Sequence, residues 1–115
     1  MTMPKGQLVY LKDMLNAIDK IGRYVDGISY EKFKTNSLLC DAVVRNLEII
    51  GEAAKNVSED IKEKYINIEW KKIAGLRDIL IHAYSGIDLE IVWDVVKNKL
   101  PGLKASIVGI IKREK

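Results

Sequence analysis

The sequence has little of several residue types, and each shortage excludes a class of site. Its 115 residues contain one cysteine and one histidine. A single chain therefore has no intramolecular disulfide and cannot hold a zinc ion through several cysteines. With His82 alone, one chain has neither a two-histidine metal site nor two histidines that act as acid and base. We expect no bound metal and no cofactor.

Long hydrophobic runs are also lacking. No apolar stretch approaches the roughly 20 residues of a membrane-spanning helix, and residues 1–6 lack the apolar region of a secretory signal. The single cysteine fits a reducing compartment. These features predict a cytoplasmic protein without a membrane partner.

The residues that are present describe a small globular protein. Hydrophobic residues make up 48% of the chain and charged residues 30%, and the length predicts a single domain over residues 1–115. The 19 Lys and Arg residues exceed the 16 Asp and Glu residues by three, which gives a net charge of +3. That charge permits a nucleic-acid partner without arguing for one, so any RNA site has to be local.

The apolar spacing is helical along the whole chain, and no strand-like alternation is sustained. Ser29, Ser58 and Asp88 are predicted N-caps, Gly27 ends the first helix, and Pro101 begins the last one. The predicted helices cover residues 7–26, 30–33, 37–57, 58–65, 69–84 and 89–99, followed by a last helix from 101 onward. The fold class is all-α: an antiparallel up-down bundle of four main helices plus short helices.

One face of the second long helix is charged and carries Asp41, Arg45, Glu48 and Glu52. The simplest interpretation is a solvated face with ion pairs between residues three or four apart. The alternative is a dimer surface or the rim of a cleft, with Arg45 or Glu52 near the segment described next.

Residues 75–84 contain the candidate chemistry: Arg77, Asp78, His82 and Tyr84. Arg77 lies inside or beside the apolar arc of its helix, where a charge is costly unless something pairs with it. Arg77 and His82 are five positions apart and diverge by roughly 140° on a regular helix. They converge only if the arginine reaches round, if the helix frays at 85–86, or if a second copy of the chain contributes.

The spacing Arg77-x4-His82-x-Tyr84 resembles the signature of the HEPN superfamily, in its HepT-like branch. The flanking segments 70–77 and 45–54 resemble the same branch, and the resemblance extends from about Leu8 to Ile111. It implies a homodimeric helical bundle that is the toxin of a type II toxin–antitoxin pair and a metal-independent endoribonuclease. The implied antitoxin is an MntA-like nucleotidyltransferase that silences the toxin by adenylylating the motif tyrosine.

Carried over by position, the resemblance makes Arg77 and His82 catalytic and Tyr84 the adenylylated residue. The family often has Asn after the arginine, where this chain has Asp78. Its extra negative charge repels an RNA phosphate unless Asp78 orients His82 or pairs with Arg77, which would make it a supporting residue.

RNA cleavage without a metal suits these residue types. When the RNA 2′-hydroxyl attacks the adjacent phosphorus, the reaction needs a base, an acid for the leaving 5′-oxygen, and a cation for the phosphorane. Histidine performs either proton transfer near neutral pH, and arginine binds phosphate oxygens in pairs. Because one chain has one histidine, we expect the active site to combine Arg77 and His82 of both protomers of a dimer.

Two other interpretations stay open. One is a non-catalytic HEPN-like partner that binds a nucleotidyltransferase and positions its substrate, which Asp78 and the small net charge keep in play. The other is a structural dimerisation bundle, which is all that composition alone supports. The presence of both Arg77 and His82 favours the nuclease, because a scaffold does not need them.

Overall fold

The computed structural model of the chain describes residues 4–82 and 88–114; for Lys5 and for residues 78–82 it describes the backbone alone. The described residues form helices and loops without a strand, as the sequence predicts. The helices are α1 (Lys5–Val25), α2 (Tyr30–Lys34), α3 (Ser37–Asn56), α4 (Glu59–Lys64), α5 (Trp70–His82), α6 (Leu89–Asp94), a π-helical segment η1 (Val95–Lys99) and α7 (Leu100–Glu114).

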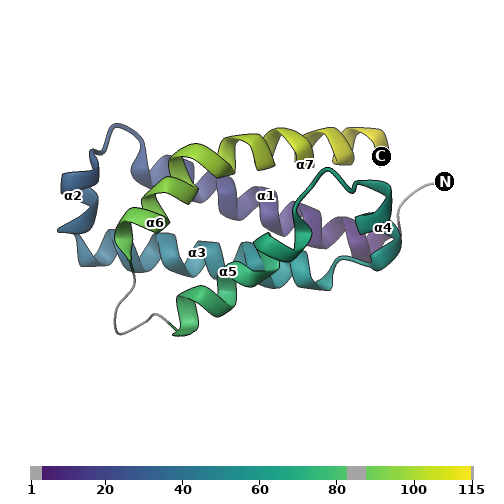
Figure 1. Cartoon of the computed structure of the whole chain (residues 1–115). Helices are drawn as coiled ribbons and strands as arrows, with labels where there is room; N and C mark the ends of the chain where they lie inside the picture. Colours follow the sequence, from purple (N-terminus) through teal and green to yellow (C-terminus); the bar gives the residue numbers. More distant parts are fainter. Residues whose placement is uncertain (1–3, 83–87, 115) are drawn as a thin grey trace.

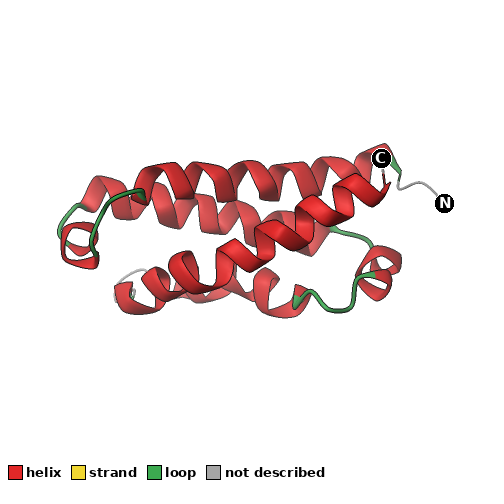
Figure 2. Cartoon of the chain, turned by 90° about the horizontal axis from the view of Figure 1, so that it is seen from above, coloured by secondary structure: helices red, strands yellow, loops and turns green. Residues whose placement is uncertain are grey.

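The long helices run alternately in opposite directions along one common axis (Figure 1). Consequently α1 begins, and α7 ends, at the same end of the bundle. The middle of the arrangement is α3, which packs against α1 on one side and against α5 on the other. The last helix, α7, lies along α1 and crosses in front of the bundle when it is viewed from above (Figure 2). The predicted all-α, antiparallel up-down bundle is confirmed.

The predicted helix starts agree with the structure because they depend on local hydrogen bonds. The Ser29 Oγ accepts a bond from the Lys32 amide at 3.2 Å, and the Asp88 Oδ1 accepts one from the Glu90 amide at 3.0 Å. Gly27, with φ of +70°, has the left-handed backbone that ends a helix region. Ser58 does precede α4, but its side chain makes no cap bond; instead its own amide donates to Gln7 Oε1 at 2.7 Å.

Pro101 lies in the first turn of the last helix, as predicted, but no loop separates that helix from the one before it. The chain remains helical from Leu89 to Glu114, and the proline lies in the first turn of α7, directly after the π-helical segment. Proline has no N–H to donate to the carbonyl four residues earlier. At the residue before the proline, the Leu100 amide donates to the Val95 carbonyl, one residue further back than in an α-helix. The fourth main helix is therefore α6, η1 and α7 together.

The core lies between α1, α3 and α7. Leu11, Met14 and Ile21 of α1 and Ile50 of α3 are fully buried, as is Ile107 of α7. Buried apolar residues recur at steps of three and four, as at 11, 14, 18 and 21 on α1 and at 43, 47 and 50 on α3, which is the reason these sequences fold as helices around a shared apolar centre. In the described ranges, no helix is both long and apolar enough to cross a membrane.

Candidate active site

The motif residues Arg77, Asp78 and His82 all lie on α5. The side chain of Arg77 is described, whereas those of Asp78 and His82 are outside the described part of the structure. Tyr84 lies outside the described residues altogether. Arg77 is therefore the motif residue whose surroundings define the candidate site.

Arg77 is paired, as its position beside the apolar arc requires. Its Nη1 atom lies 3.2 Å from Oε2 of Glu52 on α3. The pair stays accessible, because the Arg77 side chain is 41% exposed and the Glu52 side chain 49%. A guanidinium has five N–H donors, so one ion pair leaves it with capacity for a phosphate oxygen.

A hollow of about 350 Å³ surrounds this pair, between α1, α3 and α5. Arg45 and Glu52, the two residues considered as a cleft rim, line the same hollow as Arg77, and Glu52 contacts the arginine directly. The remaining lining residues are Tyr10, Asp13, Glu48, Ile49, Ala53 and Asn56. Arg45 also pairs with Glu48 at 3.6 Å and is mostly exposed, which fits the solvated-face interpretation as well.

Sequence reasoning missed Tyr10 and Asp13, which reach the hollow from α1. Nothing in the spacing of α1 marks them, because their place depends on how α1 and α3 are aligned in space. With Asp13 included, three carboxylates and two guanidiniums line the hollow. Such a hollow can stabilise the charge of one phosphate at Arg77 but does not attract RNA by general electrostatics.

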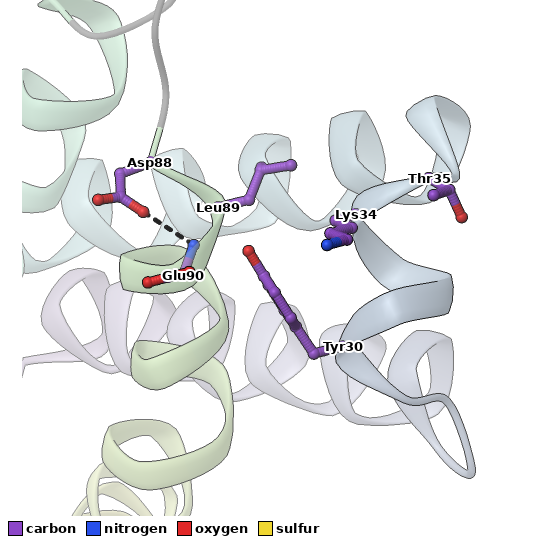
Figure 3. A pocket seen from close by; sticks show the side chains of 6 residues that line it. All are labelled: Tyr30, Lys34, Thr35, Asp88, Leu89 and Glu90. Carbon is purple, nitrogen blue, oxygen red and sulfur yellow. Dashed lines mark hydrogen bonds between the residues drawn. The ribbon is translucent and has the colours of Figure 1, made fainter.

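A second hollow, of about 590 Å³, lies between α2 and the start of α6 (Figure 3). Its lining includes Tyr30, Lys34, Asp88 and Glu90. Asp88 is occupied as the N-cap of α6, and Lys34 pairs with Glu31 at 3.0 Å. Burial, together with the charge of Glu90, raises the pKa of Tyr30 and keeps its hydroxyl protonated. This hollow has no arginine and an excess of carboxylates, so it is the weaker candidate for phosphate chemistry.

Metal ligands do not gather in the part of the chain that the structure describes, where no three His, Cys, Asp or Glu side chains cluster.

Comparison with known proteins places the chain in a family. The family model described as "Ribonuclease HepT-like" matches residues 14–110. A protein of Caldanaerobacter subterraneus subsp. tengcongensis named "Putative RNase" is 41% identical over 106 residues, which cover 92% of this chain and 95% of that protein. "Probable ribonuclease HepT" of Thermococcus cleftensis is 41% identical over 110 residues, covering 96% of this chain and all of that protein.

A longer relative has a further activity in its name. "Gamma-glutamylcyclotransferase and putative RNase" of Methanocaldococcus jannaschii is 44% identical over 110 residues, and the chain spans half of its length. No solved structure is a significant match to the chain.

The family match identifies the antiparallel helical bundle, with the R-x4-H spacing on α5 beside a charged hollow, as a protein of the HEPN type. Within that class, the chain belongs to the HepT-like ribonuclease family. The family and the enzyme class implied by the sequence resemblance are thereby confirmed.

Proposed function

We propose that this chain is a metal-independent endoribonuclease and the toxin of a type II toxin–antitoxin pair. The observation that carries the proposal is the accessible Arg77, held by Glu52 in a hollow between three helices of a HepT-like fold. An arginine placed in this way offers a cation at a point where a phosphate can enter. That placement favours local transition-state stabilisation over tight binding of RNA.

The proposed reaction is a transesterification. The 2′-hydroxyl loses its proton to a base while its oxygen bonds to the adjacent phosphorus, and the bond from phosphorus to the 5′-oxygen breaks. The leaving oxygen takes a proton from an acid, which yields a 2′,3′-cyclic phosphate and a 5′-hydroxyl. His82 performs one of these proton transfers, and Arg77 balances the charge of the phosphorane.

The dimer remains part of the proposal. One chain supplies a single His82, so the second proton transfer falls to His82 of a second copy related by a two-fold axis. We also propose that residues 1–115 form a single domain.

Cleavage in EDTA is the direct test of the nuclease. We expect the wild-type chain to cut RNA, and Arg77→Ala and His82→Ala each to lower the rate by at least about 100-fold. Arg23→Ala, which removes an exposed arginine from the last turn of α1, is the matched control and should keep the wild-type rate. Circular dichroism and size-exclusion chromatography establish that the variants fold and dimerise alike. Full activity in both motif variants would end the proposal.

Control by an MntA-like nucleotidyltransferase is the second part of the proposal. Adenylylation of Tyr84 adds a phosphodiester charge to the motif, which competes with RNA phosphate for Arg77. After incubation with such an enzyme and ATP, we expect mass spectrometry to find one added AMP on Tyr84 and none on a Tyr84→Phe variant. Addition at another residue, or no addition, contradicts this part alone.

The non-catalytic partner is the second candidate, and one observation favours it. Carboxylates outnumber guanidiniums in the hollow around Arg77, and Asp78 adds another acid to α5. If Asp78 neither orients His82 nor pairs with Arg77, the hollow suits a protein partner better than RNA. A chain that binds the nucleotidyltransferase but cuts no RNA would identify this alternative.

A further inference from the structure

The helix α3 lies close to the backbone of α5 at a glycine. Gly51 is buried, and a Cβ atom added to it would lie 3.2 Å from the Arg77 amide nitrogen and 3.2 Å from the Ile73 carbonyl oxygen. Both of these are backbone atoms of α5, which cannot turn aside as a flexible side chain can. An alanine at position 51 therefore requires α5 to move away from α3 by a few tenths of an ångström.

The other helical glycines show that this contact is particular to Gly51. A Cβ atom added to Gly22 of α1, Gly75 of α5 or Gly109 of α7 meets nothing within 4 Å. Glycine inside a helix costs about 0.5–1 kcal/mol relative to alanine. At Gly51 the close crossing of the two helices supplies a physical reason to accept that cost.

The close contact lies at the root of the motif arginine. The third atom that an added Cβ would meet is the Cβ of Arg77 itself, at 3.3 Å. The next residue of α3, Glu52, holds the other end of the same side chain through the 3.2 Å ion pair. Two consecutive residues of α3 thus fix both the root and the tip of Arg77.

Stability does not explain the Glu52–Arg77 contact. Both side chains are close to half exposed, and ion pairs of that kind contribute about 0–1 kcal/mol. Their geometry does matter for phosphate chemistry, because a charge-stabilising group acts within narrow limits of distance.

We propose that Gly51 and Glu52 are positioning residues: Gly51 sets the spacing of α3 and α5 at Arg77, and Glu52 aims the guanidinium into the hollow. This inference rests on the proposed nuclease function. It makes α3 part of the catalytic machinery, although neither residue has to touch the RNA.

Steady-state cleavage of RNA by Gly51→Ala tests the spacing. We expect kcat to fall about tenfold or more with KM changed less than about threefold, because Arg77 is displaced but not removed. Gly109→Ala adds the same methyl group to a helix where it meets nothing, and should keep the wild-type kcat. A wild-type kcat in a folded Gly51→Ala variant would overturn the spacing role.

Two substitutions at Glu52 test whether this residue aims the Arg77 guanidinium. They do not depend on whether Gly51→Ala folds, since Glu52 is half exposed. We expect Glu52→Ala to lower kcat about tenfold, and Glu52→Gln to restore part of the loss because its amide oxygen still accepts a bond from Arg77. Equal rates for wild type, Glu52→Ala and Glu52→Gln would overturn the aiming role.

A stereochemical readout separates positioning from a loss of folded protein. With RNA carrying a single phosphorothioate, the ratio of cleavage rates for the two diastereomers does not depend on the amount of active enzyme. We expect Glu52→Ala and Gly51→Ala to shift this ratio toward that of Arg77→Lys, and Gly109→Ala to leave it unchanged. An unchanged ratio in both positioning variants refutes the inference, whereas full activity in both Arg77→Ala and His82→Ala refutes the nuclease function beneath it.

Discussion

Two glutamates of this bundle make ion pairs in very different settings. Glu52 pairs with Arg77 across α3 and α5, and its side chain is 49% exposed. Glu114, at the end of α7, has a side chain that is 4% exposed and pairs with Lys64 at 2.5 Å. The same carboxylate oxygen of Glu114 also accepts a hydrogen bond from the Tyr65 hydroxyl. We refer to Lys64, Tyr65 and Glu114 as the C-terminal cluster.

The difference in burial assigns the two pairs different physical roles. Removing Glu114 leaves the buried Tyr65 hydroxyl without its acceptor, and this costs more than losing an exposed ion pair. Lys64, whose side chain is 51% exposed, can still be hydrated by water. The C-terminal cluster joins the end of α4 to the end of α7 through a buried carboxylate, whereas the carboxylate of Glu52 is half exposed. The comparison teaches that the glutamate which holds the fold is buried, and the glutamate assigned to chemistry is accessible.

We expect the largest difference between the two glutamates in the melting temperatures of Glu114→Ala and Glu52→Ala at pH 7. Glu114→Ala should lower the melting temperature by about 5 °C or more, because the buried Tyr65 hydroxyl loses its acceptor. Glu52→Ala should change it by less than about 2 °C, since its pair is exposed. Circular dichroism at increasing temperature measures both values.

For the rate of RNA cleavage we expect the opposite order, with the larger effect at Glu52. At a temperature where all variants are folded, Glu114→Ala should cut as fast as wild type while Glu52→Ala is slowed. If Glu52→Ala destabilises the chain as much as Glu114→Ala does, the division between a structural and a chemical pair fails.

Much of this arrangement was predictable from the sequence, because it depends on local chemistry. The caps at Ser29 and Asp88 and the stop at Gly27 involve neighbours within a few positions, and the sequence spacing indicates them directly. Pro101 does mark the first turn of α7, but the local rule does not show that the preceding helix runs into it without a loop. A proline usually marks a helix start or end, but the π-helical segment before it lets the helix continue.

The candidate site was predictable only in part, for a related reason. The motif identifies Arg77, and the charged face of α3 suggested Arg45 or Glu52 as neighbours, but the alignment of helices in space decides which carboxylate reaches the arginine. Asp13 of α1 enters the same hollow without any sequence signal. The pairing of Lys64 with Glu114 spans 50 positions and is likewise set by tertiary packing.

The smallest expected effect is a pH dependence that belongs to the C-terminal cluster. The hydrogen bond from Lys64, followed by that from Tyr65, lowers the pKa of Glu114 below its ordinary value of 4.5. A lowered pKa contributes stability that is present above the unfolded value and is lost as the pH falls through the folded pKa. Wild type and Glu114→Gln should therefore differ most in melting temperature above about pH 5, and this difference should shrink toward about pH 3.

Melting temperatures measured above neutral pH check the sign of this pH dependence. The bond with Glu114 raises the pKa of Lys64 above its ordinary value of 10.5. That contribution is present below the ordinary value and is lost only as the pH rises through the raised pKa. The difference between wild type and Glu114→Gln should thus stay nearly constant from about pH 6 to pH 9. A difference that grows on acidification would mean that Glu114 is not charged in the native state, and the contrast with Glu52 would then lose its electrostatic basis.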